Sequence, residues 1–325
     1  MNNTEITVEK QKKHRWRKSE KVALVTAIIP LIGFIIFSGF PLIISFIGLF
    51  CNVDLYDLSN IHWNNFEGFK SVFIPGHAFG LFYFDLSKYF YKAVVITVWI
   101  ASTQLVTLLI ALIMSTLLRK KMIGGKLFQI LFFVPYICST VAVSLMWRWV
   151  FSWENGILNS LLGTNIEWLK NPKTMTWCII IAVIWSAPGY GIVMYKAAFS
   201  NINQTLYEAA QIDGANAWQQ FRAVTLPGIA PTTFYLLMTG VGAGLLTYDL
   251  AALVIPDEWG SPGGVGSMGL TLMRLVYFLI TNSTTADANG VSYMVSCACV
   301  ISWLLFIVTG SLSMILFRQR EKSLK

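Results

Sequence analysis

The stretch 207–227 holds the residues of this sequence that are best arranged to bind another molecule. Glu208 stands early in an amphipathic segment, where a carboxylate suits the positive end of a helix dipole. Gly214 follows, and glycine is the residue that most readily adopts the left-handed conformation that ends a helix. The pattern predicts a short helix that stops at a sharp bend.

A second short helix is predicted after this bend. Trp218, Phe221 and Val224 recur every third residue, which places them on one side of a helix. We expect Leu226 and Pro227 to end this helix before the next apolar run begins. An elbow of two helices with an apolar side suits docking into a groove of a soluble partner. An ordinary amphipathic surface loop shows the same pattern, so the periodicity alone leaves both interpretations open.

One carboxylate, Asp249, lies at the end of a long apolar run that starts near residue 223. A charged side chain at the centre of a bilayer costs at least ~2.5–3.5 kcal/mol. We therefore expect Asp249 to face the interior of a helix bundle or an aqueous cavity, where it and Tyr248 would hydrogen-bond the hydroxyl groups of a passing solute. The alternative is that the apolar run ends earlier and that Asp249 is a charge at the membrane rim.

Pro188 and Gly189 interrupt another apolar run. Proline leaves a backbone carbonyl without its donor and glycine loosens the backbone, so the pair predicts a broken helix. In transporters, such breaks line solute cavities. Trp185 and Tyr190 flank the pair and are therefore candidate contacts for a solute.

Gly240 and Gly244 have the spacing that lets a second helix approach closely within a membrane. Close packing is the interpretation that we prefer, and a gating hinge is the alternative.

The sequence shows no set of residues typical of an enzyme. The three histidines, His14, His62 and His77, are scattered, and no phosphate-binding G-x-x-x-x-G-K-[ST] sequence occurs. The cysteines have no C-x-x-C spacing and are interpreted as small apolar residues; they are Cys51, Cys138, Cys178, Cys297 and Cys299. We expect this chain to have no catalytic residues and to bind no metal or nucleotide by itself.

Composition predicts an all-α protein that spans a membrane about six times. Hydrophobic residues make up 55% of the 325 residues and charged residues 12%, against about 25% charged in soluble domains. Each apolar run reaches the ~20 residues that a helix needs to cross a bilayer, where only helices satisfy the backbone of such segments. The runs are 22–53, 93–118, 127–147, 174–195, 223–248 and 288–317. A further apolar stretch, 275–286, is too short and is expected to be re-entrant or to lie at the surface.

Basic residues predict the orientation and the domain organisation. With the N-terminus inside, 17 of the 24 lysines and arginines lie on the cytoplasmic side, so both termini are expected to be cytoplasmic. Positive charge spread along one membrane face does not form a nucleic-acid groove. The first apolar run is too long for a signal peptide and is expected to remain as an anchor. The predicted regions are a basic tail (1–21), a first span (22–53), an extracellular loop (54–92), a core of five spans (93–317) with a cytoplasmic loop at 200–227, and a second tail (318–325).

Tryptophans gather at the predicted outer boundary of the spans. The residues concerned are Trp63, Trp147, Trp149, Trp153, Trp168 and Trp177. An aromatic belt at the level of the lipid headgroups explains most of them. Stacking against a sugar ring is the alternative for one or two of them.

The stretch that opened this section resembles the EAA loop of binding-protein-dependent ABC permeases, which has the form E-A-A-x-x-D-G-A followed by a phenylalanine and a closing L-P. The matching residues are Glu208, Ala209, Ala210, Asp213, Gly214, Ala215, Phe221, Leu226 and Pro227. Five further segments are similar to the sugar permeases of the maltose and glycerol-phosphate type. They are N-N-F-E-G-F (64–69), F-F-V-P-Y (132–136), W-R-W-V-F (147–151), G-I-L-N (156–159) and W-L-K-N-P (168–172).

The resemblance implies the fold of a type I ABC importer permease and a role as a transporter subunit in a bacterial-type cell membrane. It implies coupling helices that sit in a cleft of a cytoplasmic ATPase. Glu208 would then make a polar contact with the ATPase, Ala209 and Ala210 would allow close packing, and Gly214 would form the bend. Phe221 and Pro227 would fix the second arm. The implied partners are a second homologous permease, two ATPase subunits that hold ATP and Mg²⁺, and an extracellular solute-binding protein.

Two features depart from that subfamily and leave the solute open. The usual T-x-G-G-P stretch is replaced by residues 257–264, and the interruption at Pro188 is unusual. A sugar or oligosaccharide is the expected cargo, and another polar solute is the alternative. A self-contained secondary transporter would need paired acids and bases within the membrane, and here only Asp249 is available. An intramembrane enzyme would need paired catalytic residues, and the spans have none.

Overall fold

The computed structural model describes residues 18–53, 61–77, 85–119, 124–257, 262–282 and 293–323. The chain divides into two compact units, Met1–Ile47 and Gly48–Lys325. In the first unit, helix α1 (Lys18–Phe34) passes through a π-helical turn, η1 (Ile35–Gly39), into α2 (Phe40–Ile47). The apolar stretch Val25–Ile47 is long enough to cross a membrane, as expected for the first span.

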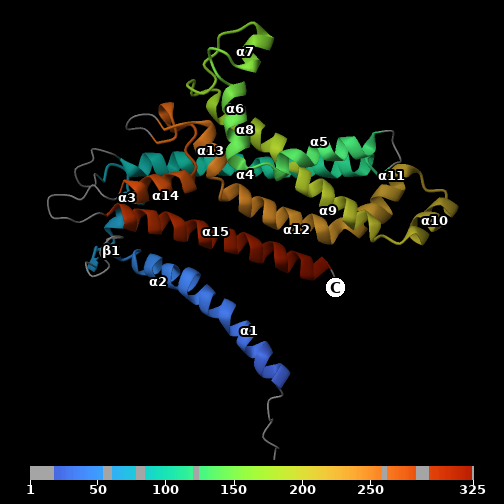
Figure 1. The fold of residues 1–325 in the computed structure, drawn as a ribbon, viewed down its shortest axis with the longest axis horizontal. Helices are drawn as coiled ribbons and strands as arrows, with labels where there is room; N and C mark the ends of the chain where they lie inside the picture. Colours follow the sequence, from blue (N-terminus) through green and yellow to red (C-terminus); the bar gives the residue numbers. More distant parts are fainter. Residues whose placement is uncertain are drawn as a thin grey trace, which may run out of the picture. The chain divides into compact units, whose positions relative to one another are not determined.

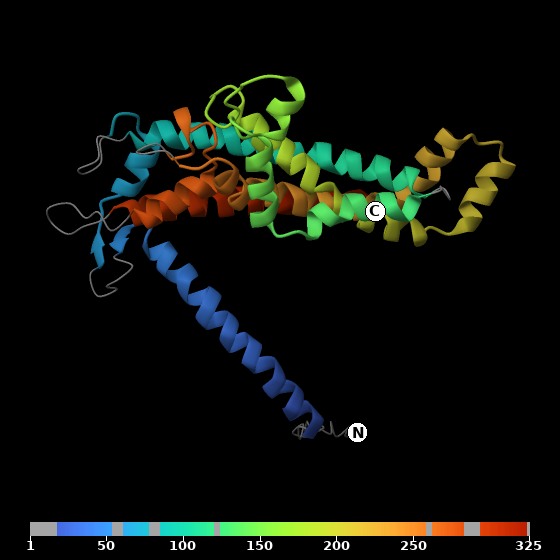
Figure 2. The same ribbon diagram turned by 45° about the horizontal axis from the view of Figure 1, so that its top comes forward.

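The second unit is built around one long helix, α4 (Leu86–Leu117), against which α9 and α12 pack. Both views show α4, α9 and α12 running alongside one another, with α15 beside α12 (Figures 1 and 2). The other helices are α3 (Glu67–Phe73), α5 (Gly125–Ile137), α6 (Thr140–Val150), α7 (Ile157–Leu162), α8 (Met175–Ser186), α9 (Pro188–Ser200), α10 (Gln204–Ile212), α11 (Ala217–Gln220), α12 (Leu226–Leu245), α13 (Asp249–Val254), α14 (Leu272–Thr281) and α15 (Met294–Ser323).

Five helices of the described residues are long and apolar enough to cross a membrane, or six if the bent pair α5 and α6 forms one span. This agrees with the expectation of about six spans. The chain is therefore a multi-pass membrane protein with a mostly helical fold. Within the described ranges, the departure from an all-α fold is a small antiparallel pair of strands, β1 (Cys51–Val53) and β2 (Ile61–Trp63).

The third predicted span, 127–147, is sharply bent in the structure. Helix α5 ends at Ile137 and α6 begins at Thr140, with an angle of 101° between them. Two residues join the helices: Cys138 has an extended backbone, and Ser139 is also non-helical, with φ −55° and ψ 133°. Helix α13 packs along α6 after the bend. The apolar composition is uniform across the bend, so hydropathy could not reveal it.

The Pro188–Gly189 pair predicted a broken helix in the fourth span. The structure shows only a one-residue interruption there. Ala187, the only residue between α8 and α9, keeps right-handed helical angles, and Pro188 takes the first position of α9. A proline at the first position of a helix costs no hydrogen bond that the helix would otherwise make. The two helices therefore form one apolar stretch, Met175–Ser200, that is long enough to cross a membrane.

Glycines set how closely the helices pack. A Cβ on Gly244 would lie 2.8 Å from the Cα of Ala101 in α4, and one on Gly240 would lie 3.7 Å from the Gln104 side chain. The close contact at Gly244 confirms the expected packing role for that glycine, whereas Gly240 has only ordinary contacts. In the same way a Cβ on Gly189 would lie 2.5 Å from the carbonyl oxygen of Phe132, so this glycine lets α9 approach α5.

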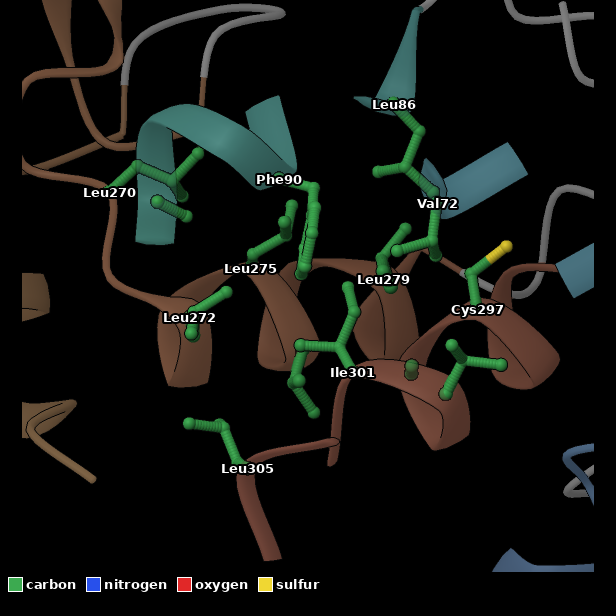
Figure 3. Close-up of a cluster of buried hydrophobic side chains, with 14 of the residues drawn as sticks. Val72, Leu86, Phe90, Leu270, Leu272, Leu275, Leu279, Cys297, Ile301 and Leu305 are labelled. Carbon is green, nitrogen blue, oxygen red and sulfur yellow. The ribbon is translucent and has the colours of Figure 1, made fainter. Parts of the chain in front are cut away.

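The largest cluster of buried apolar side chains joins α3, α4, α14 and α15. Figure 3 shows Leu275 and Leu279 of α14 between Phe90 of α4 and Ile301 of α15. A hydrogen bond of 2.6 Å from the Asn64 amide to the Ser296 hydroxyl adds a polar tie between the segment after β2 and α15. This core fixes the end of the bundle that lies opposite α10 and α11 (Figure 1).

Candidate functional site

The predicted elbow is present at residues 204–220, and each of its bends has a local cause. The side chain of Asn203 caps α10 by accepting a hydrogen bond from the backbone N–H of Thr205. Gly214 has a φ of +76°, the left-handed conformation that was expected of it. Asn216 and Gln219 then form a reciprocal capping box that starts α11. The helix–glycine–helix prediction is confirmed.

The prediction that Leu226 and Pro227 end the second arm is wrong. Helix α11 continues through a π-helical turn, η2 (Phe221–Thr225), directly into α12. A proline has no N–H to donate and its ring crowds the carbonyl four residues before it. The π turn solves this problem with one extra residue, since Leu226 donates to the carbonyl of Phe221, five residues back. The second arm of the elbow and the fifth span are therefore one continuous helical rod, Ala217–Leu245.

The elbow exposes large apolar side chains. Ile212 is 87% exposed, Trp218 68% and Leu206 53%, and the Trp218 ring stacks on Phe221 with 5.6 Å between ring centres. Of the residues assigned to the coupling loop, all are exposed except Ala210 and Phe221, which are half-buried; the exposed ones are Glu208, Ala209, Asp213, Gly214, Leu226 and Pro227. Exposed aromatic and aliphatic side chains next to an accessible carboxylate form a surface that suits a protein partner.

A buried tyrosine, which the sequence did not single out, fixes the elbow to the bundle. The Tyr207 hydroxyl accepts a 2.8 Å hydrogen bond from the Arg119 guanidinium and shares a second one, also of 2.8 Å, with the Thr225 hydroxyl. The guanidinium also lies over the Tyr207 ring, 4.2 Å from its centre. Tyr207 belongs to α10, Thr225 to the π turn, and Arg119 follows α4. These three residues, the Tyr207 hub, join three elements; the only signal in the sequence was the position of Tyr207 directly before Glu208.

A cavity of about 290 Å³ lies between α4, α9 and α12, and Tyr136 of α5 also lines it. Its polar lining consists of neutral groups, from Gln104, Thr107, Tyr136, Tyr190 and Thr239. The rings of Tyr136 and Tyr190 stack with 5.4 Å between their centres, and the Tyr190 hydroxyl lies 3.3 Å from that of Tyr235. The structure thus places Tyr190, one of the candidate solute contacts, at this cavity together with Pro188.

The other three candidates for the solute path lie elsewhere. Helix α12 ends at Leu245, so Asp249 is not deep in an apolar helix; it is the exposed first residue of α13. The Tyr248 ring packs against Tyr277, with 4.9 Å between ring centres. Trp185 packs edge-on against Trp147. Among the described residues that line the 290 Å³ cavity, none is Trp185, Tyr248 or Asp249.

Within the described part of the chain, no group of three or more histidine, cysteine, aspartate or glutamate side chains is placed to hold a metal ion. The arrangement offers a docking surface and a neutral polar cavity. The rod Ala217–Leu245 connects the two, because it carries Trp218 at the elbow and Thr239, Gly240 and Ala243 at the cavity.

Comparison with known proteins identifies the family. The model of the family described as "Binding-protein-dependent transport system inner membrane component" matches residues 107–321. A probable ABC transporter permease of Bacillus subtilis, YesP, is 26% identical over 314 residues, which cover 94% of this chain and 93% of that protein. The lactose transport system permease LacF of Rhizobium radiobacter is 30% identical over 213 residues, with 64% and 67% of the two chains covered.

Further relatives and solved structures agree with these matches. The arabinooligosaccharide transport system permease AraP of Bacillus subtilis is 26% identical over 276 residues, 82% of each chain. A chain of a bacterial ABC transporter involved in alginate import has the same fold, with a TM-score of 0.73 at 20% identity over 95% of this chain and 98% of that one. This chain is a membrane permease subunit, and it belongs to the family of inner membrane components of binding-protein-dependent transport systems.

Proposed function

We propose that this chain is the translocating subunit of an ATP-driven importer, and that it moves a neutral sugar or oligosaccharide handed over by an extracellular binding protein. The observation that carries the proposal is the continuous rod Ala217–Leu245. One end of the rod is the exposed arm of the elbow, and residues near the other end line the cavity. A movement applied to the elbow therefore reaches the cavity without a flexible joint.

The partner at the elbow is a cytoplasmic ATPase. Ile212 and Trp218 are the apolar anchors of the contact, since buried aromatic and aliphatic side chains dominate the energy of most interfaces. Glu208 adds the polar contact, and Ala209 allows close approach. A second homologous permease and a pair of ATPase subunits complete the importer. This chain binds no cofactor, and ATP and Mg²⁺ belong to the ATPases.

The proposed orientation places both termini and the elbow in the cytoplasm of a bacterial-type cell. Arg119 is part of a basic segment assigned to the inner face, and its contact with Tyr207 brings it to the elbow. In both views the C-terminal end of α15, with its own basic residues, points toward the same end of the bundle as the elbow (Figures 1 and 2). Basic residues collected at one end of a bundle favour the cytoplasmic side for that end.

The lining of the cavity supports a neutral, hydroxyl-rich cargo. Tyrosine and threonine hydroxyls and the Gln104 amide both donate and accept hydrogen bonds, as sugar hydroxyls do. Among the described lining residues none is charged, which disfavours a strongly acidic or basic solute. The names of two relatives, a lactose and an arabinooligosaccharide permease, point to the same class of cargo.

Transport then follows from the geometry. Closure of the ATPases on ATP pulls the elbow, and the Tyr207 hub transmits this pull to the end of α4 while the π turn transmits it to α12. Because α4 and α12 both line the cavity, their joint movement turns the cavity from the inner toward the outer face. Solute delivered at the outer face binds there and is released inside when the ATPases reopen.

Uptake into vesicles tests this proposal. The chain is purified together with its native partners, reconstituted with its binding protein, and supplied with labelled lactose or arabino-oligosaccharide. Uptake should require ATP hydrolysis and should stop with a non-hydrolysable analogue. Uptake that an ion gradient drives with no ATPase present would instead show a secondary transporter.

A further inference from the structure

A second pocket, of about 280 Å³, is lined mostly by residues of the loop region between α6 and α8. This loop region lies away from the elbow (Figure 1). It is lined by Arg148, Phe151, Ser152, Trp153, Glu154, Glu167, Trp168, Leu169, Lys170 and Pro256. We call it the Trp153 pocket. It shares no lining residue with the cavity between α4, α9 and α12, so the transport path described above does not account for it.

One buried asparagine holds both walls of the Trp153 pocket. Asn159, 5% exposed, donates to the carbonyls of Trp153 (3.1 Å) and Ile166 (3.0 Å). Its carbonyl oxygen accepts from the indole N–H of Trp168 at 2.8 Å. A side chain at Gly156 would collide with the backbone of Ser152, so this glycine permits the tight turn. The pocket is therefore preorganised rather than a chance gap between loops.

The charged side chains at the pocket are available to a ligand. Within the described part of the chain, the four charged side chains form no ion pair and no side-chain hydrogen bond; they are Glu154, Glu167, Arg148 and Lys170. Two carboxylates and two cations leave the pocket without net charge. They offer strong acceptors and strong donors beside the indole ring of Trp153, which is 48% exposed.

We propose that the Trp153 pocket binds one ring of a saccharide at the face where the cargo enters, as a second sugar site. An exposed indole offers a flat apolar surface for a sugar face, while carboxylates and guanidinium groups suit its hydroxyls. The volume, about 280 Å³, lies just below the range of about 300–1,000 Å³ that is typical of ligand sites, which suits a single ring. This inference rests on the proposed function, because it takes its ligand from the proposed cargo. Such a site would hold one end of an oligosaccharide before it reaches the cavity.

The test measures saccharide binding by ligand-observed NMR, with the full chain in lipid nanodiscs. Lactose and an arabino-oligosaccharide are the probes. All variants are made in the Tyr190→Ala chain, so that the 290 Å³ cavity contributes less to the measured saccharide binding. Adding Trp153→Ala, or Glu154→Gln with Glu167→Gln, should raise the Kd at least about tenfold. Adding Trp149→Ala, an exposed tryptophan of the same helix end outside the pocket, should change it less than twofold. Thermal unfolding of each variant shows that it is folded, and the glutamine pair keeps the shape of the pocket.

The following results decide whether the second sugar site exists. Equal saccharide affinity of the Trp153→Ala and Trp149→Ala chains would refute it. Loss of binding-protein docking in Trp153→Ala with unchanged saccharide affinity would assign the pocket to that protein instead. ATP-driven sugar uptake by vesicles, together with saccharide binding that does not depend on Trp153, would refute the second site and leave the proposed function standing. Saccharide binding that depends on Trp153, without any ATP-driven import, would support the site and overturn the proposed function.

Discussion

The guanidinium of Arg119, just past the end of α4, donates a 2.8 Å hydrogen bond to the hydroxyl of Tyr207 in the first arm of the elbow. The same hydroxyl reaches Thr225 in the π turn. A single buried oxygen thus joins the ends of α4 and α12, two of the three helices around the 290 Å³ cavity, to the surface on which we place the ATPase. The predictions below separate this connection from the stability of the fold.

Removing the oxygen should uncouple the elbow from the bundle. Tyr207→Phe keeps the ring under Arg119 but loses both hydrogen bonds, and it leaves the buried Thr225 hydroxyl without its partner. We expect unfolding to become easier by about 1–3 kcal/mol and transport per ATP hydrolysed to fall severalfold. Tyr91→Phe, which loses one exposed hydrogen bond to a backbone carbonyl, is the matched control. If both variants couple hydrolysis to uptake equally well, the hub does not transmit the movement.

The bend at Gly214 should tolerate no side chain, for conformational reasons alone. A Cβ there would meet no other atom within 4 Å, but φ is +76°, where an L-residue costs about 1–2 kcal/mol. Gly214→Ala should therefore weaken ATPase retention during purification. Gly242→Ala, also in open space but without a positive φ, should purify with the ATPase as the wild type does. Equal retention in the two variants would show that the bend does not need the left-handed conformation.

Pro227 should set the rotation of the elbow about the rod. Pro227→Ala removes the reason for the π turn, and a regular α-helix over 221–225 would turn the elbow by about one residue, roughly a quarter of a turn. That rotation would separate Thr225 from Tyr207. We expect a melting temperature equal to or above that of the wild type, together with reduced uptake. Unchanged uptake in a stable variant would contradict the role of the π turn.

The contact of α12 with α4 should depend on Gly244 more than on Gly240. A Cβ on Gly244 would lie 2.8 Å from the backbone of Ala101, whereas one on Gly240 meets only ordinary contacts. Gly244→Ala should lower stability by about 1–3 kcal/mol, as overpacking does, and Gly240→Ala should have little effect. Thermal unfolding of the two variants in detergent measures the difference, and equal melting temperatures would refute it.

The sequence predicted best those features that depend on residues close together in the chain. Long apolar runs placed the spans because lipid leaves the backbone no other choice. Gly214 and the spacing of Trp218, Phe221 and Val224 predicted the elbow. The break after Ile137 escaped notice because the sequence stays apolar on both sides of it. Pro227 was misinterpreted because a proline within a helical pattern usually ends or kinks the helix. Here a π turn accommodates it, and the helix continues.

The candidate site was predicted only in part. Tyr190 was found because it follows the Pro188–Gly189 pair, and the structure does place it at the cavity. Gln104, Tyr136 and Tyr235 come from three other helices, and only the tertiary arrangement brings them to Tyr190. Asp249 drew attention by its charge, but the earlier end of α12 leaves it exposed.

The most direct test of the account places a charge on the docking surface. Ile212→Glu should leave the fold intact, because this side chain is exposed, yet it puts a carboxylate where we expect an apolar contact with the ATPase. Leu161→Glu, at a similarly exposed site on α7 (78% against 87% for Ile212), is the control. ATP-dependent sugar uptake and ATPase retention should both fall at least tenfold in Ile212→Glu and stay near the wild-type level in Leu161→Glu. Wild-type uptake by the Ile212→Glu chain would contradict the claim that the elbow receives the work of ATP.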